Sequence, residues 1–321
     1  MSARLFAALV LCLATTPAAA ASFDCGKAAT PVEKAVCADP ALSALDERLA
    51  QAYRGQRERL TPQGAERLKA DQQGWLRWLR AACPPAGGTP FAQCLAEAYQ
   101  GRLRDLDETV LVGDGAFRVM LSVRYETTGG LALGPFAAPW IELPDDAATR
   151  AWNAEAMAFA RPEDTGDEPM AAARIAWAAP QGISVVVTRS WFTPRGGRSA
   201  EARAFTWLAG RGPLTAAMLF DPAADWPAAL RAACGATMAA QAAAMPTGSE
   251  RPDAETLAYL TEATCDDQAP ERWALSAAGL VIVGVQHAWA AGLDDPVLPW
   301  PALGAVLAKS WVPPRGASAR P

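Results

Sequence analysis

The stretch that decides the fold runs from residue 23 to residue 106, and its first part reads Phe23-Asp24-Cys25, then Thr30-Pro31-Val32-Glu33-Lys34-Ala35-Val36-Cys37, then Asp39-Pro40. Threonine or aspartate directly before proline is typical of a helix start, because the side-chain oxygen caps the helix and proline fits its first position. The same step returns at Thr61-Pro62 and Thr89-Pro90. Glu33 follows Thr30 by three residues and completes a capping box. We therefore predict four helix starts in this stretch.

Apolar residues recur at helical spacing behind each of the last three starts. Such spacing gathers them on one helix face, which can then be buried. The three sets are Leu42, Leu45, Leu49 and Tyr53, then Leu68, Trp75 and Leu79 with the polar Gln72 beside them, then Leu95, Ala98, Tyr99, Leu103 and Leu106. We predict an all-α bundle of three main helices after a short disulfide-tied helical turn, with Trp75 in the core and Trp78 packed near the domain junction.

Residues 1–21 have the composition of an export signal. Arg4 supplies the positive charge, residues 5–13 the apolar run, and residues 17–21 a zone of small residues for cleavage. The apolar run is shorter than the roughly 20 residues that a spanning helix needs. We expect cleavage near Ala20 or Ala21, a mature chain that starts around Ser22, and an exported protein, periplasmic or secreted, with no membrane anchor.

Seven cysteines become six when Cys12 leaves with the signal, an even number that suits an oxidising compartment. Cys12 follows Leu11, which argues against a lipoprotein signal because those signals generally carry a small residue there. Short separations favour the pairs Cys25–Cys37, Cys83–Cys94 and Cys234–Cys265, and the rival pairing crosses the first four cysteines. No C-x-x-C occurs and the only histidine, His287, is far from any cysteine, so we predict no metal site and no cofactor.

The charge is spread unevenly along the chain. Residues 22–110 carry 12 basic and 12 acidic side chains, whereas residues 111–321 carry 16 and 22, a net charge of −6. Binding to nucleic acid depends on lysine and arginine side chains that neutralise phosphates, so a nucleic-acid partner is not expected. Such a surface favours a basic protein partner, weakly at physiological salt.

The periodicity changes after Thr109. Residues 117–126 alternate between apolar and polar, which predicts a half-buried strand. Asp145 or Asp146 is predicted to cap a helix that ends near Ala160. Further strands are predicted at 182–192, 202–208 and 279–283, further helices at 226–244, 253–261 and 301–309, and a hairpin turn at 193–198. Together these elements predict that residues 111–321 form an α+β domain with a mainly antiparallel sheet.

The first of these two domains, residues 22–110, resembles the N-terminal domain of LprI-type lysozyme inhibitors, a small secreted helical module of bacteria. Beyond the helix starts, the resemblance rests on the four cysteines and on Leu45-Asp46, Leu49, Tyr53, Gln73-Gly74-Trp75-Leu76, Tyr99, Arg102 and Leu106. Residues 117–310 are similar to RsiV-type extracellular domains at Trp152-Asn153, Leu219-Phe220, Trp273-Ala274-Leu275, Gly279-Leu280-Val281-Ile282 and Pro299-Trp300-Pro301-Ala302-Leu303. This chain has Gly196-Gly197-Arg198-Ser199 where that family commonly has Gly-Gly-Ala-His.

Both resemblances imply a binding protein, because LprI-type proteins are associated with inhibiting lysozyme and RsiV-type domains with sensing it. The candidate binding loops are residues 84–90 and the run Arg195, Gly196, Gly197 and Arg198. We assign no catalytic residue: three acidic pairs, at 145–146, 266–267 and 294–295, lie where aspartate commonly caps. Two alternatives remain open, an envelope scaffold that binds another envelope protein or a cell-wall glycan, and a hydrolase that uses an aspartate pair.

Overall fold

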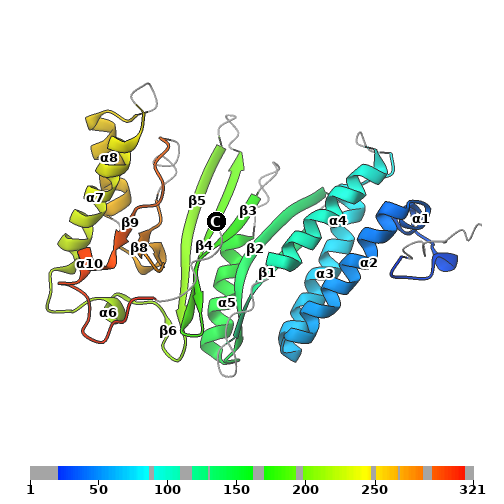
Figure 1. Cartoon of the computed structure of the whole chain (residues 1–321), viewed down its shortest axis with the longest axis horizontal. Coiled ribbons are helices and arrows are strands. Elements are labelled where there is room, and N and C mark those ends of the chain that lie inside the picture. Colours follow the sequence, from blue (N-terminus) through cyan, green and yellow to red (C-terminus); the bar gives the residue numbers. More distant parts are fainter. Residues whose placement is uncertain are drawn as a thin grey trace, which may run out of the picture. The chain divides into compact units, whose positions relative to one another are not determined.

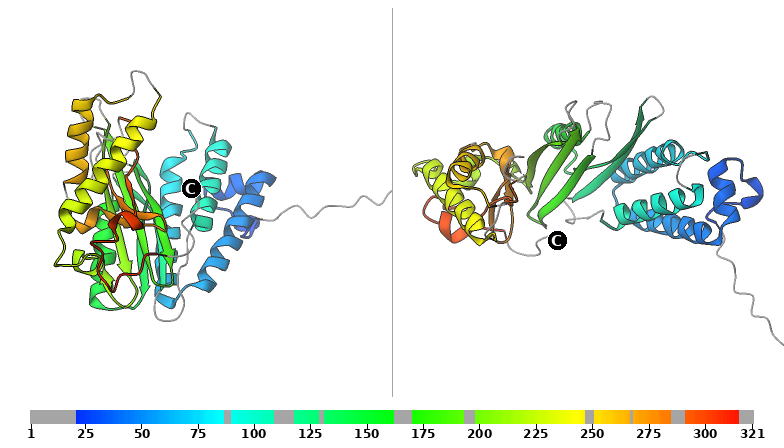
Figure 2. Two further views of the ribbon diagram at one scale, coloured as in Figure 1. Left: turned by 60° about the vertical axis from the view of Figure 1, so that its left-hand side comes forward. Right: turned by 90° about the horizontal axis from the view of Figure 1, so that it is seen from above.

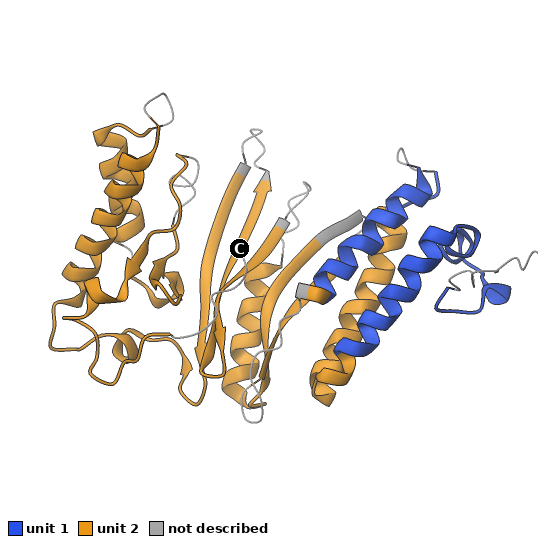
Figure 3. Cartoon of the chain, in the orientation of Figure 1, with its two compact units in different colours: residues 1–56, 83–106 blue, residues 57–82, 107–321 orange. Residues whose placement is uncertain are grey.

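The computed structural model describes residues 21–86, 90–108, 118–128, 131–161, 170–192, 198–246, 251–266, 268–284 and 291–314. The chain divides into two compact units (Figure 3): unit 1 is Met1–Gln56 with Cys83–Leu106, and unit 2 is Arg57–Ala82 with Asp107–Pro321. Helix α3, Pro62–Ala82, therefore groups with the sheet-rich region that follows. That residues 22–110 and 111–321 form separate domains stays a prediction.

Unit 1 is helical, as predicted. Its elements are η1 (Cys25–Lys27), α1 (Pro31–Ala38), most of α2 (Pro40–Arg59) and α4 (Phe91–Glu108) (Figure 1). The predicted capping box is confirmed, because the Glu33 amide donates to Thr30 Oγ1 at 3.2 Å and the Thr30 amide donates to Glu33 Oε2 at 2.8 Å. The core of unit 1 includes Val36 and members of the apolar stripes predicted from the sequence, among them Leu42, Leu49, Leu95, Leu103 and Leu106.

Unit 2 is built around a six-stranded sheet in the order β1-β2-β3-β4-β5-β6. The strands are β1 (Arg118–Thr128), β2 (Leu131–Leu143), β3 (Met170–Ala179), β4 (Gly182–Phe192), β5 (Arg198–Leu208) and β6 (Gly212–Pro213). Neighbouring strands pair antiparallel except β2 and β3, which share one parallel pair, Phe136 with Ala171. The mainly antiparallel sheet is confirmed, although neither β2 nor β3 was predicted.

Helix α5, Ala147–Ala160, covers one face of this sheet (Figure 2). Asp146 caps it as predicted, and the buried side chain of Asn153 bonds the amide and the carbonyl of Ile141 on β2, both at 2.8 Å. The core between them includes Val119, Phe136, Trp152, Phe159, Val185, Phe205 and Trp207. Strand alternation turns Ser122, Trp140 and Glu142 the other way, toward α3, which lies against β1 and β2.

The rest of unit 2 forms a second layer with its own core. It contains α6 (Ala216–Leu219), α7 (Trp226–Ala244), α8 (Ala254–Cys265), η2 (Pro270–Arg272), α10 (Trp300–Leu303) and a three-stranded sheet of β7 (Trp273–Leu275), β8 (Gly279–Ile282) and β9 (Val297–Pro299). Thr206 Oγ1 of β5 donates to the Trp273 carbonyl at 3.1 Å, and the Leu275 amide donates to Ser184 Oγ of β4 at 2.8 Å. These bonds join the two sheets.

One predicted helix in this layer is wrong in length. The helix expected at 301–309 ends at Leu303, because the chain beyond it pairs with the segment around Phe220. Phe220 and Leu307 form an antiparallel bridge, and the Ala308 amide donates to the Leu219 carbonyl at 3.0 Å. Pairing with a distant segment has overridden the local helical pattern.

Candidate functional site

The six cysteines of the expected mature chain form the three local disulfides, Cys25–Cys37, Cys83–Cys94 and Cys234–Cys265. The crossed alternative is therefore wrong. The first bridge ties η1 to α1, and the third joins α7 to α8. The second closes the connection that leads into α4, which is one of the two candidate loops.

That candidate loop, residues 84–90, is closed by the disulfide Cys83–Cys94. Cys83 is buried, and Cys94 lies in the first turn of α4. Pro84, Pro85, Ala86 and Pro90 are all exposed, whereas residues 87–89 lie outside the described residues. The described ends of the loop are thus exposed, proline-rich and held together by a disulfide.

The second candidate loop falls largely outside the described residues, which include neither Arg195 nor Gly196 nor Gly197. Arg198 begins β5, and its side chain is also outside the description. The described residues therefore do not place this loop against the rest of unit 2. Its role as a binding loop stays a prediction.

An arginine and aromatic cluster lies on β4 and β5 where they approach that loop. Arg189 donates to Glu201 Oε2 across the strand pair, from Nε at 3.1 Å and from Nη2 at 2.7 Å. The guanidinium groups of Arg189 and Arg203 lie over the Phe159 ring, 4.9 and 4.8 Å from its centroid, and Arg189 also lies 5.7 Å from that of Trp191. The sequence offered no signal for this cluster, because its members come from one helix and two strands.

A polar network made of Arg67, Asp71, Ser122 and Arg124 joins α3 to β1; we call it the α3–sheet network. Ser122 Oγ donates to Asp71 Oδ2 at 2.7 Å and accepts from Arg67 Nε at 2.9 Å. Asp71 Oδ1 lies 3.6 Å from Arg67 Nε and 3.9 Å from Arg124 Nε. Burial lowers the pKa of Arg67, and the charge of Asp71 opposes that shift.

The α3–sheet network contains residue types that also occur in catalytic sites. Its serine and aspartate, however, are buried as in a structural contact. Ser122 is 0% exposed and Asp71 is 2% exposed, so a substrate cannot reach the serine hydroxyl. Ser122 also donates its proton to Asp71 while its oxygen is held by Arg67. We therefore assign the network to packing of α3 on the sheet. Trp78 supports this, because its ring centroid lies 4.9 Å from that of Tyr125 on β1.

A second buried polar cluster lies in unit 1 around Asp46 of α2, which is 8% exposed. The Tyr99 hydroxyl of α4 donates to Asp46 Oδ1 at 3.1 Å, and the Ser22 amide donates to Oδ2 at 2.7 Å. Burial raises the pKa of Tyr99 well above its ordinary value, and the neighbouring Asp46 charge raises it further. The phenol therefore stays protonated and keeps donating to Asp46.

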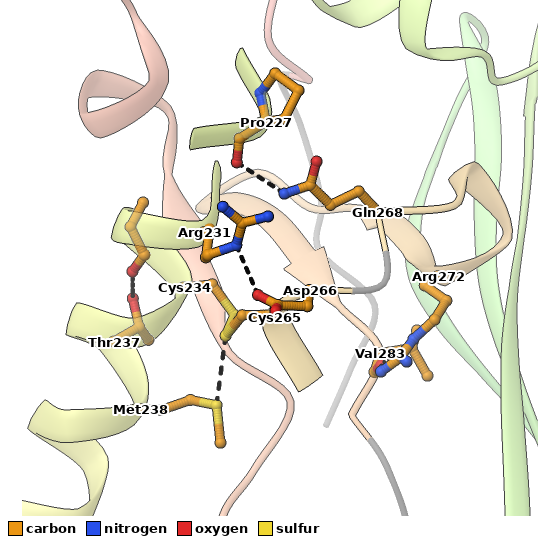
Figure 4. Close-up of a disulfide and its surroundings, with 11 residues drawn as sticks. Pro227, Arg231, Cys234, Thr237, Met238, Cys265, Asp266, Gln268, Arg272 and Val283 are labelled. Carbon is orange, nitrogen blue, oxygen red and sulfur yellow. Dashed lines mark hydrogen bonds and ion pairs between the residues drawn. A yellow bond between two sulfur atoms is a disulfide. The ribbon is translucent and has the colours of Figure 1, made fainter. Parts of the chain in front are cut away.

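The disulfide Cys234–Cys265 joins α7 to α8 near the Arg231–Asp266 pair (Figure 4). An open groove is lined by residues of the same two helices and by Asp266. Arg231 Nε donates to Asp266 Oδ1 at 2.6 Å, and Gln268 Nε2 donates to the Pro227 carbonyl at 2.7 Å. The groove has a volume of about 480 Å³ and is lined by Arg231, Ala239, Ala254, Leu257, Ala258, Thr261, Glu262 and Asp266. Its lining is mostly small and apolar, and its charged residues include the Arg231–Asp266 pair.

The described members of the three acidic pairs, apart from the exposed Asp294, take structural roles. Asp146 caps α5, Asp145 pairs with Arg150 at 2.7 Å, and Asp266 pairs with Arg231. Asp295 pairs with Arg174 at 2.9 Å and accepts from the Gly284 amide at 2.8 Å. Asp267 and His287 lie outside the described residues. The part of the chain that the structure describes contains no group of three or more His, Cys, Asp or Glu side chains that could hold a metal ion. Nor does that part contain a helix with the length and apolar character needed to span a membrane.

Comparison with known proteins gives a match to the first part of the chain. The family model "Lysozyme inhibitor LprI" matches residues 25–106. Two curated proteins named lipoprotein LprI, from Mycobacterium bovis and Mycobacterium tuberculosis, are each 42% identical over 92 residues, which is 29% of this chain and 44% of each relative. The match thus spans less than half the length of these relatives.

A solved structure covers a larger part of the chain at a lower similarity. The crystal structure of a DUF3298 family protein from Pseudomonas aeruginosa covers 63% of this chain and 99% of its own, with a TM-score of 0.42 and 12% identity. The resemblance of residues 117–310 to RsiV-type domains stays a prediction. Residues 25–106, by contrast, match the LprI lysozyme inhibitor family, as their sequence pattern implied.

Proposed function

We propose that the protein binds a c-type or related lysozyme and slows its action without turning over a substrate. The observation that carries this proposal is the match of residues 25–106 to the LprI lysozyme inhibitor family, at 42% identity to curated relatives. The acidic balance of residues 111–321, 22 acidic against 16 basic side chains, supports it, because a negative surface speeds encounter with a basic enzyme.

The packing of α3 narrows the choice of binding surface within the LprI-type segment. The side of α3 that carries Gly64, Arg67, Asp71 and Trp78 is occupied by β1 and β2. An enzyme cannot bind there without displacing the sheet. The binding surface then falls on the other parts of the segment, which include the disulfide-based loop at residues 84–90.

We propose that this loop enters the substrate cleft of the enzyme. A loop whose ends are fixed by a disulfide and by prolines loses less conformational entropy when it binds, and this raises affinity. Its described residues are uncharged and exposed, so they can enter a cleft without burying an unpaired charge. Another envelope protein or a cell-wall glycan remains the alternative partner.

The experiment is an inhibition assay with a bacterial cell-wall substrate, the purified mature protein and two matched variants. Pro85→Arg places a bulky cation in the loop and is expected to raise the inhibition constant at least about tenfold, or roughly 1.4 kcal/mol of binding free energy. Gln51→Arg adds the same charge at an exposed position of α2 and is expected to leave the constant unchanged.

The outcomes distinguish a wrong binding loop from a wrong function. If the wild-type protein inhibits and Pro85→Arg inhibits equally well, the loop assignment is wrong and the function stands. The double variant Arg195→Ala and Arg198→Ala then tests the second candidate loop. If the wild-type protein neither binds nor slows any lysozyme, the proposed function is wrong.

A further inference from the structure

The carboxylate of Asp46 is buried, and the two groups that donate to it are uncharged in the full-length chain. Among the described residues, no lysine or arginine nitrogen lies within the 4.0 Å of an ion pair with Asp46. Its two oxygens accept one hydrogen bond each, from the Tyr99 hydroxyl and from the Ser22 backbone nitrogen. A carboxylate removed from water is costly unless a positive charge or several donors compensate it.

The donor at Ser22 lies at the expected processing site. Both Ala18-Ala19-Ala20 and Ala19-Ala20-Ala21 provide the small residues that cleavage of an export signal requires, so the sequence allows a cut after Ala20 or after Ala21. The two cuts place the new amino group on different nitrogens. Only a cut after Ala21 places it on the nitrogen that lies 2.7 Å from Asp46 Oδ2.

We infer that the chain is cut between Ala21 and Ser22 and that the α-ammonium group created by this cut forms an ion pair with Asp46. The reaction is hydrolysis of one peptide bond by a signal peptidase of the export machinery. Water adds across the amide, the Ala21 carbonyl carbon becomes a carboxylate, and the Ser22 nitrogen takes up protons to become an ammonium group. The nitrogen keeps its hydrogen bond to Asp46 and gains a positive charge.

This pairing would link processing to the packing of unit 1. Asp46 lies on α2, Tyr99 on α4, and Ser22 precedes η1, so a single carboxylate holds three separate segments. In the unprocessed chain the same contact is an ordinary amide hydrogen bond. After the cut it is a charge-assisted bond, which is shorter and stronger in general. We therefore expect the processed chain to be more stable than the same chain with a blocked amino terminus.

The first test is the mass of the protein recovered after export from a bacterial host. We expect a mature chain that begins at Ser22. A mature chain that begins at Ala21, or at any other residue, would overturn the inference, because its amino group would not be the nitrogen that contacts Asp46.

The second test compares thermal unfolding at neutral pH of two forms of the mature chain, with a free and with an acetylated Ser22 amine. Acetylation keeps the N–H donor and removes the charge. We expect the free form to melt about 2 °C higher, because a charge-assisted bond replaces a neutral one. The difference should vanish in Asp46→Asn and persist in Glu47→Gln, a carboxylate one residue along α2 that pairs with Arg54 at 3.5 Å.

Equal melting temperatures for the two forms of the wild-type chain would overturn the ion pair. An equal shift in the Asp46→Asn and wild-type backgrounds would do the same, because the charge would then act elsewhere. Should Asp46→Asn fail to fold, a glycine added before Ser22 gives an independent comparison. This addition moves the amine away from Asp46, and we expect it to lower the melting temperature as acetylation does.

Discussion

Gly64 and Gly74 allow α3 to lie close to the sheet of unit 2. A Cβ atom at Gly64 would lie 2.3 Å from Glu142 Oε2, and one at Gly74 would lie 2.7 Å from the Tyr125 carbonyl oxygen. Glu142 is 0% exposed, and its Oε2 accepts from the Thr61 amide at 2.8 Å and from Thr61 Oγ1 at 2.6 Å. Neither neighbour can move freely, so both positions require glycine.

The variant Gly74→Ala is expected to lower the free energy of unfolding by about 1–3 kcal/mol, because backbone must shift to admit the methyl group. The matched control is Gly55→Ala on α2, where nothing lies within 4 Å of the added atom. This control should raise the free energy of unfolding by about 0.5–1 kcal/mol, the helix penalty of glycine relative to alanine. Urea unfolding measures both. A Gly74→Ala chain as stable as the wild type would contradict the packing of α3 on β1.

Asp146 caps α5, and its hydrogen bonds from the Thr149 amide and side chain hold the pKa of the carboxyl below its ordinary value. A group whose pKa is lowered by folding stabilises the protein above its unfolded pKa of about 3.9, and this contribution is lost as the pH falls through the folded value. Asp146→Asn keeps a capping oxygen without the charge. We expect its melting temperature to fall less than that of the wild type between about pH 6 and pH 2. An identical fall in both chains would show that the cap charge contributes nothing.

At the scale of elements, α3 is buried on two faces, one through an apolar stripe and one through polar contacts with the sheet. The sequence predicted only the apolar stripe. The apolar stripe with Leu68, Trp75 and Leu79 follows from helical periodicity, and all three residues are buried. The pair Arg67 and Asp71 has the i, i+4 spacing of a surface ion pair, which is its common role. Its partner Ser122 lies 51 residues beyond Asp71, a distance at which no local pattern can predict contact.

The α3–sheet network is expected to act as a unit. Asp71→Ala removes the carboxylate between two arginines and should lower the free energy of unfolding by about 3–5 kcal/mol, because it takes the carboxylate partner away from the largely buried Arg67 guanidinium. Ser122→Ala should cost about 1–3 kcal/mol, the range for leaving a buried group unsatisfied. The double variant, measured by urea unfolding, should be less destabilised than the sum of the single variants. Strict additivity would mean that the two residues do not interact.

Local sequence patterns cannot reveal pairing between distant segments, and this explains which strands were predicted and which were missed. The strand β1 alternates and was recognised, and β4 has a long apolar run. The strand β2 contains alanine, proline and glycine, and β3 is rich in alanine; these residues have low strand propensity. The two strands are held by pairing with β1 and β4. Of the candidate site, the disulfide pairs followed from sequence spacing. The sequence did not predict which face of α3 the sheet covers, because that contact depends on the tertiary structure.

At the scale of the whole molecule, the charge distribution predicts how salt acts on binding. Residues 22–110 are neutral, and the net charge of −6 belongs to residues 111–321. Long-range attraction accelerates encounter and is screened by salt, whereas contacts in the formed complex are screened much less. Raising the salt concentration should therefore lower the association rate with a basic lysozyme more than it raises the dissociation rate. A dissociation rate that carries most of the salt dependence would contradict this view of the second region.

The most direct test of the central claim is lysozyme activity with and without the purified mature protein, together with calorimetry of the two proteins. We expect saturable binding and a loss of activity that grows with the concentration of the protein, with no product formed by the protein alone. Absence of binding to several lysozymes at concentrations of tens of micromolar, roughly the weak end of specific recognition, would contradict it.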